Sequence, residues 1–344
     1  MQCSTPLRLW VVRNFDANWQ LRWLILMKPD FQKVLVTGGA GFIGSHLVDA
    51  LLSAGCEVRV LDNLSTGKLS NLCKVHSHIN FLHGDIRDSE MVLRAVDKCE
   101  VIFHQAAVVS VPQTVEQPVG SAMVNELGTL NILEAARNAG VKRVIIASSC
   151  AVYGDSPELP KHESMIPNPL SPYAVQKLTG EYYARLYHQL YGLETVCLRY
   201  FNVYGPRQDP TSPYSGVISI FLNKAVLNQG PVIYGDGNQS RDFVFVGDVV
   251  HANILAASCT GIIAQPFNVG TGKNVRINRL WEMIARLSHV NISADYRSWR
   301  SGDINESVAD ISRSKNILKF VPAYSFEDGL RLTWQWYNSA QRKI

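Results

Sequence analysis

Short runs of β-branched and apolar residues alternate with amphipathic stretches from Lys33 onward. This alternation is typical of a parallel sheet whose strands are joined by crossover helices. Several runs are apolar at nearly every position, as in strands that are buried on both faces. The pattern predicts strands at Val34–Thr37, Glu57–Asp62, Ile79–His83, Val101–His104, Arg143–Ala147 and Glu194–Arg199, and helices at Gly41–Ala54, Ser89–Val96, Pro118–Asn138 and Ser171–Tyr191.

The rhythm changes after Asn202, where loops rich in Gly, Pro, Asn and Asp (205–216 and 235–240) separate shorter elements. We therefore predict an α/β fold: a Rossmann-type doubly wound parallel sheet over residues 33–204, which binds a dinucleotide, and a smaller C-terminal α/β substrate-binding domain over 205–344. Two further buried strands are expected at 242–246 and 267–269. They indicate that segments near 242–269 return to the first domain.

Residues 1–32 form an N-terminal extension of uncertain role, with three of the seven tryptophans and four basic residues against two acidic ones. A targeting segment is one interpretation, which Asp16 and the lack of a small-residue cleavage site weaken. We favour the other, in which Met27 opens the functional protein, because the first strand follows it closely. A variant that starts at Met27 is then expected to be fully active.

Composition narrows the class of protein. The 344 residues carry 33 Lys and Arg against 29 Asp and Glu, and this formal charge of +4 is too small to indicate a nucleic-acid partner. No apolar run reaches the ~18 residues of a membrane-spanning helix. The seven cysteines form no CxxC pair, which argues against a disulfide framework and a zinc site and favours a reducing cytoplasm. We expect no metal.

The segment GGAGFIG at residues 38–44 is a GxxGxxG pattern between a strand and a helix. Its glycines allow a tight turn whose backbone amides can face a pyrophosphate. Asp62 closes the second strand 18 residues after Gly44, where a carboxylate accepts hydrogen bonds from the adenosine ribose and repels a 2′-phosphate. No basic residue directly follows Asp62, so NAD is favoured over NADP; Asp85 and Ile86 are candidates for the adenine edge. The alternative is a mere turn with a strand-end cap.

Tyr173 and Lys177 lie four residues apart, on one face of a predicted helix. A phenol has a pKa of about 10, which a nearby ammonium and the positive nicotinamide are expected to lower. Alone, the pair could be an ordinary exposed one. Ser149, 24 residues before Tyr173, ends the fifth strand at the edge where ligands bind. Ser149, Tyr173 and Lys177 together can deprotonate a carbinol while NAD accepts hydride; Ser148 is a competing hydroxyl.

Seven ordered motifs carry a family resemblance. They are GGAGFIGSHL, LDNLSTG, GDIRD, SSCAVYG, SPYAVQK, LRYFNVYGPRQDP and SRDFVFVGDV. The chain resembles the extended short-chain dehydrogenase/reductase family, and more narrowly its NAD-dependent UDP-hexose 4-epimerases, including those that act on UDP-N-acetylglucosamine. The resemblance extends from Val34 to about Leu330.

The resemblance implies a role for each matching residue. Ser149 and Tyr173 contact the sugar 4-hydroxyl, Tyr173 is the base, and Lys177 tunes it and binds the nicotinamide ribose. The implied cofactor-binding residues are Gly38, Gly41, Phe42, Ile43, Gly44, Asp62, Asn63, Ser65, Gly67, Asp85, Ile86, Gln105, Ala106, Ala107, Asn125, Tyr173, Lys177 and Tyr200. The implied substrate-binding residues are Ser110, Ser149, Tyr173, Asn202, Val217, Tyr234, Arg241, Arg300, Asp303 and Ser307.

Within the substrate set, the resemblance implies that Asn202, Arg241 and Arg300 hold the diphosphate. It also implies that Asp303 accepts the uridine ribose hydroxyls and that Tyr234 stacks on the uracil. Each has an ordinary alternative, such as a surface ion pair or a core aromatic.

The same scaffold hosts several chemistries. Related dehydratases and decarboxylases have acidic residues where this chain has Cys150 and Ala151. The expected reaction is therefore C4 epimerisation through a transient 4-keto sugar. The resemblance implies that Ser307 stands where a bulky aromatic would block a 2-acetamido group, which favours UDP-N-acetylglucosamine and UDP-N-acetylgalactosamine, alongside UDP-glucose and UDP-galactose. Ser307 could also be a loop serine one or two positions out of register.

Alternatives remain at this stage. Val109 suggests a tighter pocket, and Arg207 could bind a C6 carboxylate, as in a UDP-uronic acid 4-epimerase, or brace its own loop. A non-catalytic NAD-binding regulatory protein is the alternative from another class. The resemblance also implies a homodimer that packs through helices 118–138 and 171–191.

Overall fold

The computed structural model describes residues 29–210, 216–262, 264–299 and 305–341. Three sequence-based predictions lie outside the described residues: the role of the N-terminal extension with a start at Met27, and the substrate contacts of Arg300 and Asp303.

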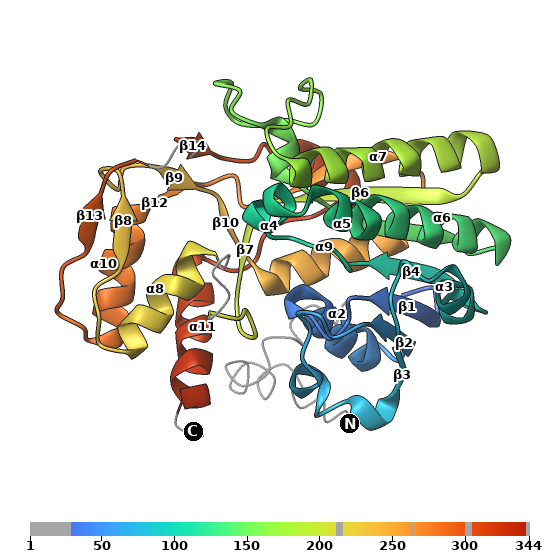
Figure 1. Cartoon of the computed structure of the whole chain (residues 1–344), viewed down its shortest axis with the longest axis horizontal. Coiled ribbons are helices and arrows are strands. Elements are labelled where there is room, and N and C mark those ends of the chain that lie inside the picture. Colours follow the sequence, from blue (N-terminus) through green and yellow to red (C-terminus); the bar gives the residue numbers. More distant parts are fainter. Residues whose placement is uncertain (1–28, 211–215, 263, 300–304, 342–344) are drawn as a thin grey trace, which may run out of the picture.

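The larger of the sheets is parallel throughout and contains seven strands in the order β11-β6-β5-β4-β1-β2-β3 (Figure 1). The strand order changes direction between β1 and β4, which makes their carboxyl ends the expected ligand-binding crevice. The strands are β1 (Lys33–Thr37), β2 (Glu57–Asp62), β3 (Ile79–His83), β4 (Val101–His104), β5 (Arg143–Ser149), β6 (Glu194–Tyr200) and β11 (Gln265–Val269). The predicted Rossmann-type doubly wound sheet is confirmed.

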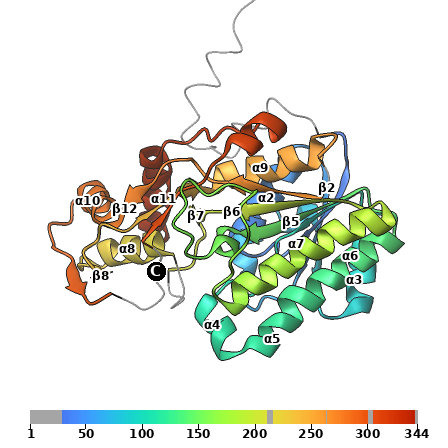
Figure 2. The ribbon, with the colours of Figure 1, turned by 90° about the horizontal axis from the view of Figure 1, so that it is seen from above.

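Helices cover both faces of this sheet (Figures 1 and 2). The helices α3 (Ser89–Val96), α6 (Gly128–Asn138) and α7 (Pro172–Tyr191) pack on one face, and α2 (Phe42–Ser53) and α9 (Val246–Ser258) on the other. Successive residues of β1 belong to opposite cores: Val34 and Val36 to the one under α2, Leu35 to the one under α6. Two buried faces explain why the strand sequences are apolar at almost every position.

The predicted helix at 118–138 is interrupted. It consists of α5 (Pro118–Ala122), a π-helical turn (Met123–Leu127) and α6, and a short helix α4 (Val111–Glu116) that the sequence did not predict precedes it. A π-turn inserts one extra residue into the helix and is often found at functional sites. Here it contains Asn125.

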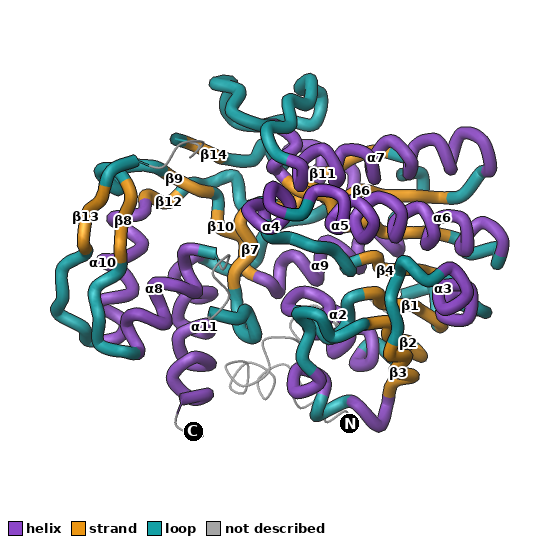
Figure 3. The backbone as a smooth tube through the Cα atoms, viewed as in Figure 1, coloured by secondary structure: helices purple, strands orange, loops and turns teal. Residues whose placement is uncertain are grey.

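The C-terminal half is built around helices α8 (Val217–Val226), α10 (Ile277–Ser288) and α11 (Phe326–Gln341), with small sheets beside them (Figure 3). Its core gathers Phe221, Leu280 and Trp281. The small sheets are β7 (Asn202–Tyr204) with β10 (Phe243–Phe245); β9 (Ser240–Arg241) with β12 (Val275–Arg276) and β14 (Glu306–Ser307); and β8 (Val232–Tyr234) with β13 (Asp295–Arg297). Single 3-10 turns cover Leu69–Leu72, His76–His78 and Cys150–Tyr153, and a π-turn covers Ser314–Leu318.

One of the two strands expected to return does join the large sheet, since β11 pairs with β6. The other does not: β10 pairs with β7 outside the large sheet, and it is the following helix, α9, that packs back on the dinucleotide-binding half. Among the described residues, no helix combines the length and the hydropathy that crossing a bilayer requires.

Candidate active site

The glycine turn between β1 and α2 is closely packed. Gly38 has a φ of +67°, and a Cβ atom there would lie 2.8 Å from the Cα of Ala106, at the end of β4. A Cβ on Gly44 would lie 2.1 Å from the carbonyl oxygen of Gly38. Helix α2 begins after Gly41 with no side-chain cap and no acidic residue in its first turn. This helix start therefore keeps backbone amides available for an anion, as a pyrophosphate requires.

Asp62 is buried at the end of β2 and holds the loops around it. Its carboxylate accepts hydrogen bonds from the backbone amides of Ala40 (2.9 Å) and Leu64 (2.7 Å). A Cβ on Gly67 would lie 2.9 Å from the same carboxylate. Asp62 thus acts as the strand-end cap that was the alternative interpretation, at the position where a ribose is expected.

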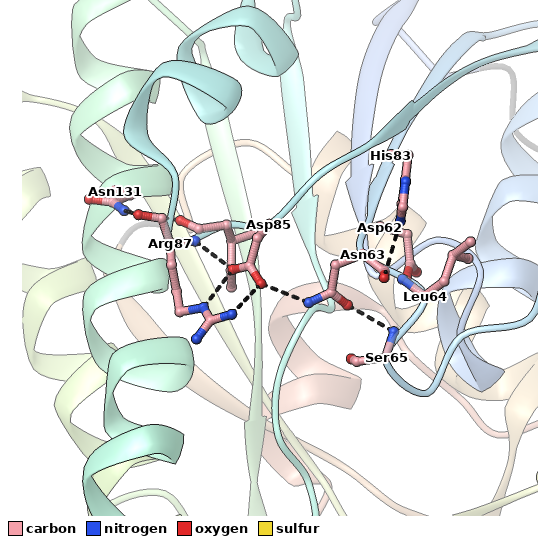
Figure 4. A network of polar contacts seen from close by, with 9 residues as sticks. Asp62, Asn63, Leu64, Ser65, His83, Asp85, Arg87 and Asn131 are labelled. Atoms are coloured by element: carbon pink, nitrogen blue, oxygen red, sulfur yellow. Dashed lines mark hydrogen bonds and ion pairs between the residues drawn. The ribbon is translucent and has the colours of Figure 1, made fainter.

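A polar network continues from Asp62 to β3 (Figure 4). The side chain of Asn63 donates to Asp85 over 2.8 Å and accepts from the amide of Ser65 over 3.0 Å. Arg87 pairs with Asp85, and this side-chain contact keeps the pKa of Asp85 low, at about 2. The network presents a carboxylate and an amide at the predicted adenine edge.

Ile86, unlike the polar Asp85 and Arg87 on either side of it, faces the core. Its side chain is buried in the core under α6, where it lies against Gly128; a Cβ there would be 2.5 Å from it. The side chain of Asn131 donates to the backbone carbonyl of Ile86. The side chain of Ile86 therefore has a packing role in the structure.

The segment after β4 is held in place from the π-turn. Asn125 is buried, and its side chain bonds both the amide (2.8 Å) and the carbonyl (2.9 Å) of Val108. It also donates to Gln176, the neighbour of Lys177, over 2.7 Å. Asn125 thus connects the end of the predicted cofactor-binding segment 105–107 with the helix of Tyr173 and Lys177.

Two further predicted residues form one cluster. Gln105 donates to the hydroxyl of Tyr200 over 3.1 Å, and both contact Asn253 of α9. Ser110, by contrast, caps helix α4 by accepting from the amide of Gln113, so its hydroxyl already has a structural partner.

Tyr173 and Lys177 lie near the end of β5 on the first turns of α7. The ammonium of Lys177 donates to the carbonyl of Ala147 over 2.8 Å and lies 5.9 Å from the centroid of the Tyr173 ring. The hydroxyl of Tyr173 hydrogen-bonds with Ser149. The structure thus brings Ser149, Tyr173 and Lys177 together, as predicted.

The electrostatics of these groups differ from the prediction. Burial raises the pKa of Tyr173 to about 12, although the hydrogen bond with Ser149 lowers it. Burial also lowers the pKa of Lys177 to about 8. In the chain by itself, desolvation of the phenolate therefore outweighs any help from Lys177. The predicted lowering of the Tyr173 pKa also included the positive charge of the nicotinamide. A lowered pKa therefore depends on that charge.

The two neighbouring serines at the end of β5 have separate roles. Ser148 is buried and donates to Glu181 over 2.5 Å. Ser149 is partly exposed and contacts Tyr173. Glu181 thus occupies Ser148, and Ser149 is the hydroxyl that lies beside Tyr173, as predicted for the catalytic one. Glu181 is a residue that sequence reasoning missed, although its position four residues after Lys177 could have revealed it.

Three of the predicted substrate residues, Asn202, Arg241 and Ser307, lie near the buried Asp242. Both the amide and the side chain of Asn202 donate to its carbonyl, over 3.0 and 3.1 Å. Arg241 precedes it, and Ser307 is the cross-strand partner of Arg241 between β9 and β14. The charges of Asp242 and Arg241 also affect the pKa of Cys150, next to Ser149. Arg241, of the predicted substrate set, is thus near enough to the predicted catalytic residues to act on the neighbour of Ser149.

Two predicted substrate residues lie further along the C-terminal half. Val217 begins α8 and is partly buried, and Tyr234 ends β8, also partly buried. Gly235 follows with a φ of +78°, and a Cβ there would lie 2.4 Å from the ring of Trp299. Sequence reasoning missed this half-exposed indole beside the position assigned to the uracil.

Arg207 pairs with Asp49 of α2 over 2.6 Å, and both side chains are largely buried. It therefore braces its loop against the dinucleotide-binding half, and the contact crosses between two elements instead of staying within the loop. Val109, the other residue expected to affect the pocket, has an exposed side chain and fills no core position.

A family model describes residues 34–270 as the NAD dependent epimerase/dehydratase family, and the chain belongs to this family. The resemblance stated from the motifs is confirmed. The chain is accordingly an NAD-dependent enzyme of this family. The glycine turn and Asp62 fit that cofactor.

Individual relatives match almost the whole chain. A putative UDP-glucose 4-epimerase of Methanocaldococcus jannaschii is 43% identical over 90% of this chain and 99% of its own. The UDP-N-acetylglucosamine 4-epimerase of Methanobrevibacter ruminantium, solved with UDP-N-acetylmuramic acid, is 42% identical with a TM-score of 0.87, over 90% of this chain and 99% of its own. The UDP-glucose 4-epimerase of Thermus thermophilus, solved with NAD, is 40% identical with a TM-score of 0.82, over 90% and 100%.

Proposed function

We propose that this chain is an NAD-dependent UDP-hexose 4-epimerase that interconverts UDP-N-acetylglucosamine and UDP-N-acetylgalactosamine, and also UDP-glucose and UDP-galactose. The observation that carries the proposal is the grouping of Tyr173, Lys177 and Ser149 at the end of β5, where the Lys177 ammonium donates to the carbonyl of Ala147 and lies 5.9 Å from the centroid of the Tyr173 ring. The similarity to proteins named UDP-glucose and UDP-N-acetylglucosamine 4-epimerases supports it.

NAD, when bound beside the end of β5, would supply a reversible hydride acceptor for C4 of the hexose. Ser149 binds the 4-hydroxyl, and Tyr173 takes the hydroxyl proton as the C4–H bond breaks. The Lys177 ammonium, held by the carbonyl of Ala147, favours the phenolate. The 4-keto sugar turns about its bond to the diphosphate, and Tyr173 returns the proton.

The two positions that follow Ser149 provide no acid or base for elimination chemistry. Cys150 follows Ser149, and burial raises the pKa of its thiol to about 12, so the thiol keeps its proton near neutrality. Ala151 has no ionisable group. This favours epimerisation over dehydration.

The preference for acetylated substrates rests on Ser307. It is a small, buried residue paired with Arg241, and Arg241 is a predicted ligand of the diphosphate. A UDP-uronic acid 4-epimerase would need a free cation for the sugar carboxylate, and its candidate, Arg207, is already paired with Asp49. This observation favours the neutral hexoses.

We further propose a cytoplasmic homodimer. The described cysteines Cys56, Cys73, Cys99, Cys150, Cys197 and Cys259 are free thiols, as a reducing compartment allows. Large apolar side chains are exposed along two adjacent helical segments: Val119, Met123 and Leu127 in one, and Val175, Tyr182, Leu186 and Leu190 in the other. Exposed apolar areas of this kind mark interaction sites. A second copy of this chain would cover them.

A test compares UDP-glucose, UDP-N-acetylglucosamine and UDP-glucuronate with no added cofactor, and isomer formation is followed by chromatography. We expect turnover of the acetylated and the plain hexose from retained NAD. A preference for UDP-glucuronate would overturn the substrate assignment. A non-catalytic NAD-binding protein would give no isomer with any of them, and accumulation of NADH would indicate a net dehydrogenase.

A further inference from the structure

Helix α7 is attached to the end of β5 at three successive positions. Tyr173, Lys177 and Glu181 follow one another at intervals of four, so they lie on one face of the helix. Each contacts one residue of the stretch 147–149. Lys177 donates to the carbonyl of residue 147 over 2.8 Å, Glu181 accepts from the hydroxyl of residue 148 over 2.5 Å, and Tyr173 hydrogen-bonds with residue 149.

Glu181 connects this face of α7 to a second strand as well. Its carboxylate forms a bidentate pair with Arg199 of β6, through distances of 2.8 Å and 2.7 Å. Both side chains are buried, with 8% and 3% exposed. The guanidinium of Arg199 also lies 4.8 Å from the ring centroid of Tyr153. A two-pronged contact fixes the orientation of the carboxylate as well as its distance.

We propose that Glu181 is a positioning residue for the reaction: together with Ser148 and Arg199 it sets the height and rotation of α7 above the sheet, so that Tyr173 and Lys177 reach the end of β5. The inference rests on the proposed function, because it requires Tyr173 to be the base. Successive residues of this face are four apart, about 6 Å along the helix axis. A displacement at Glu181 therefore passes to Lys177 and Tyr173 through an unbroken helix.

The cost of such a displacement is large relative to its size. A misplacement of about 1 Å at a reacting group can reduce the rate by about 10²-fold. Burying an ion pair seldom adds net stability compared with apolar residues of the same volume. The Glu181–Arg199 pair is thus better explained by the geometry it enforces than by the stability it adds.

The first test is Ser148→Ala, which removes one contact of Glu181 and leaves its pair with Arg199. We expect kcat to fall by about tenfold or more, with KM and the NAD retained per chain unchanged. The acid limb of the kcat–pH profile should move to higher pH, because a displaced Tyr173 loses the hydrogen bond with Ser149 that lowers its pKa. Ser148→Thr keeps the hydroxyl and should restore most of the rate.

Glu181→Gln is the second variant. It leaves the buried Arg199 charge without its counter-ion, so we expect a lower melting temperature along with the loss of kcat. Tyr187→Phe is the matched control, since it removes a hydrogen bond from α7 to Glu134 of α6, at the far end of the helix. The control is expected to keep the wild-type kcat and pH profile.

The outcomes separate the two proposals. If Tyr173→Phe abolishes turnover but Ser148→Ala keeps wild-type kcat and pH profile, the positioning role is wrong and the proposed function stands. If Tyr187→Phe lowers kcat as much as Ser148→Ala does, general loosening of α7 explains the loss and the positioning role is again wrong. If Tyr173→Phe turns over at the wild-type rate, the proposed function itself fails. Should Glu181→Gln not fold, Ser148→Ala still decides.

Discussion

Replacing Tyr173 by phenylalanine removes one oxygen atom from the site and leaves the rest in place. The phenyl ring fills the same space, and Lys177 keeps its hydrogen bond to the carbonyl of Ala147. The helix also keeps its N-cap, in which the hydroxyl of Ser171 accepts from the amide of Ala174. Ser149 alone loses a partner, and it still caps the following turn. The variant is therefore expected to fold normally and to retain NAD.

The expected loss follows from the role of the phenol. Burial raises the pKa of Tyr173 to about 12 in the chain by itself, so ionisation near neutrality needs a compensating positive charge worth about 1.36 kcal/mol for each pKa unit. A positioned base contributes about 10²- to 10⁴-fold, which corresponds to about 3 to 5 kcal/mol of transition-state stabilisation. Phenylalanine can neither accept nor return the proton. We expect kcat to fall by that factor with KM little changed.

The assay follows the conversion of UDP-N-acetylglucosamine to its C4 epimer by chromatography. NAD released by denaturing the protein is measured in parallel, to separate loss of chemistry from loss of cofactor. Lys74→Met, at an exposed lysine of the loop before β3, controls for the effects of substitution as such. Turnover in the phenylalanine variant within a factor of about two of wild type would show that another group removes the proton.

Three further predictions follow from other parts of the structure. Ser307→Tyr should reduce turnover of UDP-N-acetylglucosamine at least about tenfold more than that of UDP-glucose, because the added ring occupies the space of the acetamido group; equal losses would remove Ser307 from this role. If the proposed homodimer forms through this exposed apolar area, Met123→Glu should convert it to monomers in sedimentation, since the substitution introduces a charge there; an unchanged dimer would place the interface elsewhere. Burial lowers the pKa of His104 from 6.5 to about 3. Between these two pH values the unfolded chain binds a proton at His104 that the folded chain does not, so the unfolding free energy decreases as the pH falls from about 6.5 towards 3. In His104→Gln the decrease of the unfolding free energy between about pH 6.5 and about pH 4.5 should be smaller by up to about 3 kcal/mol, as measured by urea denaturation; an identical decrease would show that His104 is not a buried neutral group.

The strands of the large sheet could be predicted from the sequence because their signal is local. β2, β3 and β4 begin and end where the apolar runs do, and α3 likewise. The glycine turn and Asp62 could be predicted for the same reason, since a strand, a tight turn and a helix follow one another within a short segment. The pair Tyr173 and Lys177 needed only helical spacing.

The π-turn at Asn125 could not be predicted in this way. Periodicity indicated one continuous helix over 118–138, and the extra residue is accommodated because Asn125 bonds Val108 and Gln176, which lie on other elements. The pairing of β10 with β7 could not be predicted from the sequence either. A three-residue apolar run does not specify which sheet it joins, because that depends on the partner available in space.

The amino-acid sequence thus determined the parallel sheet, the dinucleotide turn, the residues of the proposed catalytic set and the family, because each depends on residues that are close together or regularly spaced along the chain. The tertiary structure alone decided which serine lies beside Tyr173, what Arg207 pairs with, and how α7 is held against the sheet. Ser148 and Ser149 are adjacent and chemically alike, and they differ only in which side chain of α7 each one meets. Such choices depend on contacts between residues that are distant along the chain, and folding brings those residues together only when the strands pair and the helices pack.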